Sequence, residues 1–222
     1  MNSLIAAAIA PGLAICIYIY WKDKFDREPK RFLIYSFFLG MLSTIPAFVL
    51  EAAVKNSLFE IRHGSYFWTL IACVYIGLAE EGSKYFFVRR FAYRNGSFNE
   101  PFDGITYSVM VAMGFATVEN IFYVLEGGLQ TAFFRAFLAV PAHAVNGVII
   151  GFYLGRQKML GVKNAGITGL LLASGLHAAY DFFLMINNNS GLWSGAVLAL
   201  ILGLRFSLKA IRSHQEASPF RS

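Results

Sequence analysis

Seven long apolar runs, separated by short polar or glycine-containing segments, constrain the fold of this chain more than any other feature. They cover approximately residues 4–20, 32–54, 66–88, 105–125, 131–154, 165–186 and 192–208. A run of about 18 apolar residues can cross a bilayer as a helix, which satisfies its backbone hydrogen bonds within one segment. The sequence therefore predicts an all-α fold: a polytopic membrane helix bundle of about seven transmembrane helices, forming a single integral-membrane domain over residues 1–222.

The composition narrows the class of protein to which this chain belongs. Of the 222 residues, 57% are apolar and 14% are charged, whereas soluble domains average about 25% charged residues. This excludes a disordered chain and argues against a soluble enzyme. The formal net charge of +6 does not indicate nucleic-acid binding, because the basic residues lie in short connections and not on an aromatic-interleaved surface. We expect the lipid bilayer as the environment and no nucleic acid as a partner.

The basic residues predict the orientation of the chain. Fifteen of the 19 Lys and Arg residues fall in four segments, 21–31, 89–101, 156–164 and 205–222, which alternate with three poorly basic connections. Cytoplasmic connections of membrane proteins carry an excess of Lys and Arg. These four segments are therefore predicted to be cytoplasmic, which places the N-terminus outside and the C-terminus inside.

Seven ionisable residues lie well inside the predicted spans, where a charged side chain costs on the order of 3 kcal/mol on insertion scales. Such residues are functional candidates. Three others, Glu51, Lys55 and Arg135, lie near the outer ends of their spans and are interpreted as structural, because long side chains there can reach the membrane surface. The seven candidates are Glu80, Glu81, Lys84, Glu119, His143, His177 and Asp181.

Small residues accompany these polar positions at helical spacing. In the sixth run, Gly169 and Ala173 precede His177 and Asp181 at intervals of four residues. Residues four apart share one face of a helix, and small residues allow close helix contact. The third and fourth runs place Gly77 and Ala116 near their charged residues in the same way. Four helices are therefore predicted to converge on one buried polar cavity, with a catalytic core at approximately residues 66–186.

The fifth run combines His143 with a seam of glycines. Gly147, Gly151 and Gly155 continue from His143 at intervals of four residues, toward the predicted cytoplasmic side. Pro141 is expected to kink this helix just before His143, because proline lacks the backbone N–H that a helix needs.

Each polar position also has a structural interpretation. Glu80 and Lys84 are spaced as an i, i+4 ion pair, and His177 and Asp181 as a hydrogen-bonded pair. A lone histidine on an apolar face is more often structural than catalytic. The whole set nevertheless exceeds what packing requires, because it combines three carboxylates on two helices with two histidines and an aspartate. We therefore interpret the set as functional.

Adjacent carboxylates beside imidazoles in a low-dielectric pocket suit general acid–base catalysis. A glutamate could activate a water for attack on a peptide carbonyl, while the histidines and Asp181 stabilise the oxyanion or protonate the leaving amine. The sequence has no HExxH zinc pair and no GxSxG nucleophile elbow. We expect no cofactor, but a metal ion stays open as an alternative. Its mixed nitrogen and oxygen ligands would be His143, His177, Glu81 and Asp181.

Several short motifs together resemble the PrsW family of bacterial intramembrane proteases. The resemblance follows the chain in order and covers most of it, apart from the last apolar run. It rests on Ala79-Glu80-Glu81-Gly82-Ser83-Lys84, Gly114-Phe115-Ala116-Thr117-Val118-Glu119-Asn120, Ala142-His143-Ala144 and His177-Ala178-Ala179-Tyr180-Asp181. It extends through Ile9-Ala10-Pro11-Gly12, Asp26-Arg27-Glu28-Pro29, Phe37-Phe38-Leu39-Gly40 and Asp103-Gly104-Ile105.

The PrsW family is distantly similar to the CAAX prenyl endopeptidase and bacteriocin-processing group, whose motifs are Glu-Glu-x-x-x-Arg, Phe-x-x-x-His and His-x-x-x-Asn. This chain departs from all three motifs, as the PrsW branch does. Lys84 stands one residue before the arginine position, Glu119 takes the place of the second-motif histidine, and Asp181 replaces the asparagine. His143 is the candidate for the role of the missing histidine.

The resemblance implies an intramembrane peptidase of the bacterial cell membrane, for which the residues favour a glutamate-dependent and metal-independent mechanism. It would make the first, extracytoplasmic cut in a single-pass anti-sigma factor, which leads to release of an extracytoplasmic-function sigma factor for envelope-stress transcription. By matched positions, Glu80, Glu81 and His177 are the leading catalytic residues. His143 and Asp181 accompany them, with Lys84 and Glu119 as supporting polar groups. Either glutamate could be the base.

Three alternatives stay open from the residues alone. The first is a metal-dependent or CAAX-protease-like membrane peptidase with the same fold. The second is a proton-coupled membrane carrier that uses the carboxylates and histidines as a relay, although no internal repeat supports it. The third is a non-catalytic transmembrane-helix binder that holds its partner in the glycine seam of the fifth run.

Overall fold

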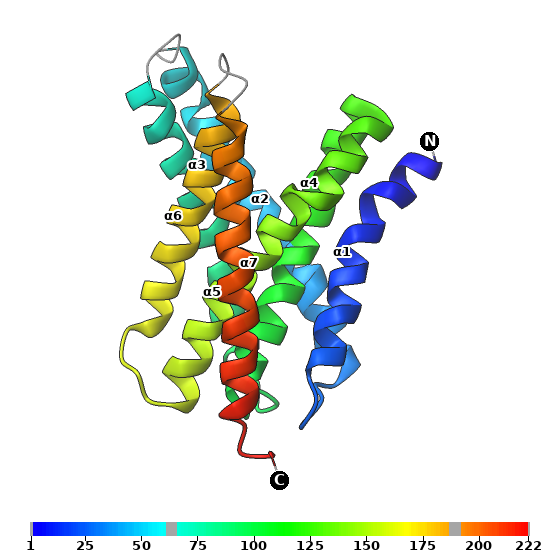
Figure 1. The fold of residues 1–222 in the computed structure, drawn as a ribbon, viewed down its shortest axis with the longest axis vertical. Helices are drawn as coiled ribbons and strands as arrows, with labels where there is room; N and C mark the ends of the chain where they lie inside the picture. The colour runs from blue at the N-terminus through cyan, green and yellow to red at the C-terminus, as the bar shows by residue number, and fades with distance from the viewer. Residues whose placement is uncertain (1, 61–65, 187–191, 222) are drawn as a thin grey trace.

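The computed structural model describes residues 2–60, 66–186 and 192–221, with residues 2 and 54–60 described by their backbone alone. Every regular element in these ranges is helical, which confirms the all-α prediction (Figure 1). The elements are α1 (Asn2–Lys22), α2 (Lys30–Glu60), α3 (Tyr66–Phe87), the π-helical turn η1 (Val88–Ala92), α4 (Pro101–Phe137), α5 (Ala139–Met159), α6 (Ala165–Met185) and α7 (Trp193–Glu216).

The helices form a polytopic bundle. Five helical segments among the described residues are long and apolar enough to cross a membrane. One of them, Pro101–Met159, has 59 residues and would extend roughly 90 Å as one straight helix, about three times the thickness of the hydrocarbon core. It folds back at Gly128, whose φ is 71°, within the predicted break between the fourth and fifth runs. The helix α3 carries the buried charges and lies between α2 and α6.

The ends of the bundle agree with the predicted alternation of basic connections. The segments after α1, before α4 and between α5 and α6 all lie at the end where the chain finishes, and the N-terminus lies at the opposite end (Figure 1). An odd number of crossings requires this arrangement. The side that faces the cytoplasm stays a prediction from the positive-inside bias.

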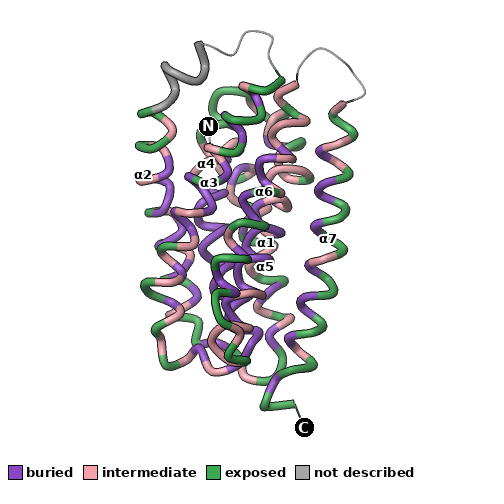
Figure 2. Tube along the Cα trace, turned by 90° about the vertical axis from the view of Figure 1, so that its left-hand side faces the viewer, coloured by how far each residue is buried: buried purple, intermediate pink, exposed green. Residues whose placement is uncertain are grey.

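The first half of α4 is the centre of the bundle. Every residue from Pro101 through Thr117 is buried, and α4 packs against α1, α2 and α5 (Figure 2). A helix that is enclosed on all sides must be apolar or small on all sides. The side chains of Tyr107, Phe102 and Phe115 are among the largest that are fully buried.

The glycine seam of α5 lies against α4. A Cβ atom on Gly151 would collide with the carbonyl oxygen of Gly104, and one on Gly155 would collide with the carbonyl oxygen of Pro101. Because the two backbones touch along this seam, it has no room for another helix. The prediction that a partner helix would occupy the seam is therefore wrong, and its small residues serve the internal packing of α4 on α5.

Several helix boundaries differ from the predicted runs. The predicted run 131–154 is divided at Leu138, where φ is −119° and ψ is −68°, between α4 and α5. The expected disturbance near Pro141 thus occurs three residues earlier, because proline cannot donate a backbone hydrogen bond and its ring crowds the preceding turn. The last run also extends further than predicted, since α7 continues to Glu216.

Candidate active site

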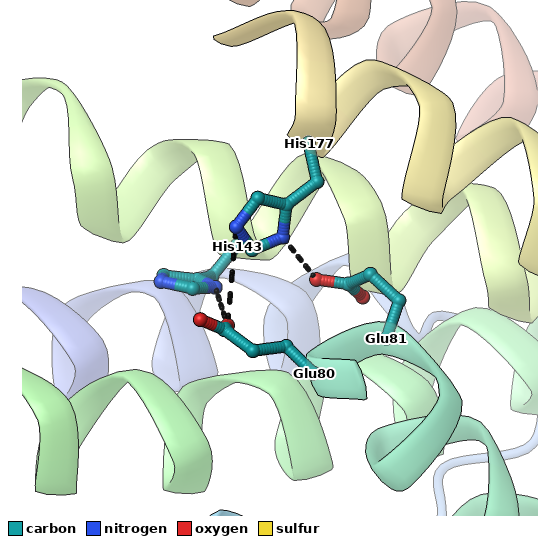
Figure 3. Close-up of side chains that lie close together, drawn as sticks. All are labelled: Glu80, Glu81, His143 and His177. Carbon is teal, nitrogen blue, oxygen red and sulfur yellow. Dashed lines mark hydrogen bonds and ion pairs between the residues drawn. The ribbon is translucent and has the colours of Figure 1, made fainter. Parts of the chain in front are cut away.

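The structure brings all seven polar candidates of the sequence together at the meeting point of four helices. The α3 helix supplies Glu80, Glu81 and Lys84, and α6 supplies His177 and Asp181. Glu119 from α4 and His143 from α5 complete the group. Figure 3 shows the imidazoles of His143 and His177 facing the two adjacent carboxylates of α3. The predicted convergence of four helices is therefore present in the fold.

The ammonium of Lys84 lies at the centre of this group. Its Nζ atom is 2.8 Å from Glu81 Oε1, 3.2 Å from Glu80 Oε2 and 3.0 Å from His143 Nδ1. The ring of Phe115 lies below it, with 3.9 Å between Nζ and the ring centroid. An ammonium has three N–H donors and no acceptor, so these three polar partners use all of its donors.

The position of Lys84 determines the tautomer of His143. Because the ammonium can only donate, His143 Nδ1 must accept, and Nε2 of the neutral ring then carries the hydrogen. Nε2 lies 2.8 Å from Glu119 Oε2, and it donates to this carboxylate. Arg135 Nη2 lies 2.8 Å from the same oxygen of Glu119. A chain of polar contacts therefore leads from Lys84 through His143 and Glu119 to Arg135.

His177 is held by a carboxylate at each ring nitrogen. Nδ1 lies 2.9 Å from Glu81 Oε1, and Nε2 lies 3.3 Å from Asp181 Oδ2. Nε2 is also 3.9 Å from Glu80 Oε2. An imidazole between two carboxylates can donate from both nitrogens when it is protonated. The two carboxylates thereby fix the position of the ring beside Glu80.

The two glutamates have different surroundings. Glu80 lines a cavity of about 820 Å³, whereas Glu81 is fully buried behind it and is absent from the cavity wall. Glu81 Oε1 accepts from Lys84, from the His177 ring and from Asn146 Nδ2 at 3.3 Å. Glu80 is thus the carboxylate placed to meet a reactant, and Glu81 the one placed to hold the surrounding donors.

The cavity leads from this group toward the end of the bundle that holds the N-terminus. Its wall includes Glu126, next to the fold-back at Gly128, and Met185 at the end of α6. Both residues lie at the end opposite the basic connections. Most of the wall is apolar with a small number of charged groups, which is the usual character of a site that binds an organic substrate.

Two residues interpreted as structural belong to this cavity. Glu51 and Arg135 both line it, and Arg135 binds Glu119 and, through Nε at 2.7 Å, Asn120 Oδ1. The structure differs from the sequence interpretation in the position of Arg135, because α4 folds back at Gly128. The returning turns bring Arg135 to Glu119. The side chain of Lys55 lies outside the described residues.

Asn146 is a site residue that sequence reasoning missed. It is buried and donates to Glu81. A signal for it was present, because Asn146 follows His143 by three residues in an apolar run and therefore shares its face of the helix.

Four residues of the candidate site have the ligand types of a metal site. Glu80, Glu81, His143 and His177 each offer a ligand atom within 4.8 Å of the others, and Glu81 Oε2 is enclosed without a hydrogen-bond donor among the described residues. The donor types suit zinc. However, the Lys84 ammonium lies 2.8–3.2 Å from three of these donors, where zinc would stand about 2.1 Å from each. With Lys84 in this position the residues do not fit a metal ion, because two cations would share one space.

Comparisons with known proteins cover most of the chain. Residues 28–207 match the family described as "PrsW family intramembrane metalloprotease". "Protease PrsW" of Bacillus subtilis (strain 168) is 38% identical over 193 residues, which cover 85% of this chain and 86% of the relative. "Protease PrsW" of Geobacillus kaustophilus (strain HTA426) is 37% identical over 197 residues, with 88% and 85% covered. The protein of that name in Clostridioides difficile (strain 630) is 33% identical over 191 residues, with 82% and 79% covered. No solved structure matches the chain significantly.

Proposed function

Because this chain belongs to the PrsW family of intramembrane proteases, we propose that its cavity is the site at which a peptide bond of a single-pass membrane protein is hydrolysed. The observation that carries the proposal is the position of Glu80, a carboxylate in the cavity wall with two oriented imidazoles beside it. The family match supports a multi-pass membrane peptidase, and the residue roles below are the proposal.

In the proposed reaction Glu80 is the general base. Its carboxylate takes a proton from a water molecule as the water oxygen forms a bond to the peptide carbonyl carbon. The protonated Glu80 then gives that proton to the peptide nitrogen, and the bond between carbon and nitrogen breaks. One water is consumed, one acid and one amine are formed, and no covalent enzyme intermediate is required.

His177 is proposed to stabilise the oxygen of the tetrahedral intermediate. Its ring is fixed between Glu81 and Asp181. Because both ring nitrogens face carboxylates, the proposed stabilisation comes from the positive charge of the protonated ring, which is held in place before the reaction. His143 has a positioning role, because its Nδ1 holds the Lys84 ammonium while Glu119 holds its Nε2. Glu81 positions Lys84 and His177 in the same way.

The proposed mechanism uses Lys84 as the central cation and needs no metal ion, although the matched family is described as a metalloprotease. The ammonium contacts both glutamates, so it compensates their charges where both side chains are buried. We expect 1,10-phenanthroline, which removes zinc and iron but not Mg²⁺, to leave the cleavage rate unchanged in a buffer that contains Mg²⁺. A loss of activity that returns on addition of stoichiometric Zn²⁺ would contradict this role of Lys84.

The proposed substrate is an anti-sigma factor with one transmembrane helix, cleaved on the extracytoplasmic side of the bacterial cell membrane. The resemblance of the motifs supports the kind of substrate. The course of the cavity supports the side, because its wall reaches the end opposite the basic connections. A single transmembrane helix would enter the cavity from the bilayer. The apolar wall of the cavity suits such a segment.

The function is tested by comparing the N-termini of membrane proteins in host cells. Cells that lack the protease would express the wild type or the double variant Glu80→Gln/Glu81→Gln at equal abundance, with and without envelope stress. We expect a new N-terminus near the outer end of a single-pass protein, present with the wild type alone. Identical sets of N-termini under all conditions would contradict the protease proposal and favour the carrier, for which proton flux is the measurement.

A further inference from the structure

A second group of acidic residues lies outside the cavity, at the end of the bundle that carries the basic connections. We call it the second acidic cluster. It joins the segment between α1 and α2 to the start of α4, and each member is at most 3% exposed. The proposed reaction uses none of these residues, although the motifs Asp26-Arg27-Glu28-Pro29 and Asp103-Gly104-Ile105 meet here. Its members are Asp23, Glu28, Glu100 and Asp103.

The carboxylates of this cluster are close together. Asp23, Glu100 and Asp103 each offer one oxygen within 4.8 Å of an oxygen of the other two. Glu28 makes a side-chain contact with Asp103. Like charges at such distances repel strongly away from water, so the cluster requires a compensating positive charge or bound protons.

Backbone and hydroxyl donors satisfy only part of the cluster. Asp103 Oδ2 accepts from the backbone N–H groups of Asn99 at 2.7 Å and Glu100 at 2.8 Å, and Asp23 Oδ2 accepts from that of Glu28 at 3.0 Å. The hydroxyls of Tyr107 and Ser218 donate to Glu28 and Glu100.

Two carboxylate oxygens of the cluster are left without a donor in the described part of the chain, which indicates a bound ligand. Asp23 Oδ1 and Asp103 Oδ1 are enclosed and have no hydrogen-bond donor among the described residues, although both side chains are 0% exposed. A buried carboxylate oxygen without a donor is costly. Two such oxygens in one cluster are ligand positions that the protein itself leaves open.

No basic side chain forms an ion pair with the cluster within the described part of the chain. Its carboxylates have no Lys, Arg or His nitrogen within 4.0 Å. Two basic residues that are nearby in sequence or space are engaged with backbone instead. Lys158 Nζ donates to the carbonyl oxygens of Tyr93 and Asn95, and Arg27 Nε donates to that of Asp23. Burial raises the pKa of Asp23 to about 6 and that of Glu28 to about 7.

We propose that the second acidic cluster binds a hard divalent cation, Mg²⁺ or Ca²⁺, through Asp23, Glu100 and Asp103. These cations prefer ligand sets made only of oxygen, and the cluster supplies carboxylate oxygens without a competing nitrogen or sulfur ligand. The cation would fasten the connection between α1 and α2 to the first turn of α4. Since Ser218 donates to Glu100, it would also fasten the segment that follows α7. The site is separate from the proposed catalytic group, which is built around Lys84.

The test uses the purified full-length protein in lipid nanodiscs after removal of metal ions with EDTA. Mg²⁺ and Ca²⁺ are titrated separately, and binding is measured by calorimetry and by thermal unfolding. We expect one bound ion per chain and an unfolding temperature raised by about 5–10 °C at roughly a hundred times the Kd. The arm with the lower Kd identifies the preferred ion. Asp23→Asn and Asp103→Asn should each lose this response, whereas Glu80→Gln in the cavity should keep it.

Three outcomes would overturn the proposal: no bound ion at millimolar concentration, equal binding by Asp103→Asn, or loss of binding in Glu80→Gln. If protons neutralise the cluster instead, the folded chain holds protons that the unfolded chain releases. Stability would then fall as the pH rises from about 4 to about 6 or 7 and change little above that, with or without the ion.

The aspartate variants are expected to fold, because each removes a repelling charge and retains an oxygen acceptor. Should one of these variants fail to fold, binding of Mn²⁺ to a chain with an unaltered cluster tests the proposal instead. It should broaden the spectrum of a nitroxide on Ala217→Cys, next to Ser218, in a chain whose two native cysteines are replaced. An unbroadened spectrum at saturating Mn²⁺ would overturn the proposal.

Discussion

Glu80→Gln is expected to reduce the rate of peptide-bond cleavage by roughly 10²- to 10⁴-fold, the usual contribution of a general base. Glutamine has the same shape as glutamate and can still accept from Lys84, but its amide cannot take a proton from water. Substrate binding should therefore persist. The measurement is single-turnover cleavage in proteoliposomes, with the substrate identified from the N-terminal comparison, together with the Kd for that substrate.

Glu126→Gln is the matched control for this substitution. Glu126 lines the same cavity and is exposed at its outer part, so the control makes the same chemical change away from the imidazoles. We expect it to cleave at the wild-type rate. A Glu80→Gln protein with more than about a tenth of the wild-type rate would contradict the role of Glu80 as base.

Glu81→Gln separates the two adjacent glutamates. Because Glu81 accepts from Lys84, His177 and Asn146, loss of its charge should lower both the cleavage rate and the unfolding temperature. Glu80→Gln should lower the rate with little change in unfolding temperature. The opposite pattern would exchange the roles of the two residues in the proposed mechanism.

Gly114→Ala is expected to lower the free energy of unfolding by about 3 kcal/mol, the upper part of the range for overpacked cores. A Cβ atom on Gly114 would collide with the Phe37 carbonyl oxygen and lie 3.0 Å from Met41 N. These are backbone atoms of α2, which cannot rotate away as a side chain can. The helices α2 and α4 would have to separate, and α4 also carries Phe115 and Glu119 of the candidate site.

Gly175→Ala is the matched control for the packing prediction. Gly175 lies inside α6, where a Cβ atom would meet nothing within 4 Å. Alanine favours a helix over glycine by up to about 1 kcal/mol, so this variant should be at least as stable as the wild type. Thermal unfolding in nanodiscs and abundance in membranes measure both variants. A Gly114→Ala protein that unfolds within about 2 °C of the wild type would contradict the predicted clash.

The sequence alone predicted the helical bundle and the set of polar residues that meets inside it. Both follow from local properties. An apolar run must form a helix in lipid whatever its neighbours are, and an ionisable residue within such a run is costly wherever the helix lies. The family resemblance is likewise confirmed by the match over residues 28–207.

The proposed division of roles inside the candidate site rests on the tertiary structure. Glu80 and Glu81 are adjacent in sequence, and only the packing of α3 against α6 places one in the cavity wall and the other behind it. From the sequence, Lys84 could have formed only an ordinary i, i+4 ion pair with Glu80. In the fold, the surrounding helices place it at the centre of the polar group. Arg135 enters the site because the chain reverses at Gly128.

The second acidic cluster could likewise not be predicted from the sequence. Asp23 and Asp103 are 80 positions apart in the sequence. Taken separately, each is an ordinary charged residue at a helix end. Their closeness depends on α1, α2 and α4 being packed together. Sequence determined which segments enter the membrane and which side chains are costly there, because those free energies are local. Tertiary structure decided which charges meet, which carboxylate faces the cavity and which oxygens have no donor, because these depend on contacts between distant segments.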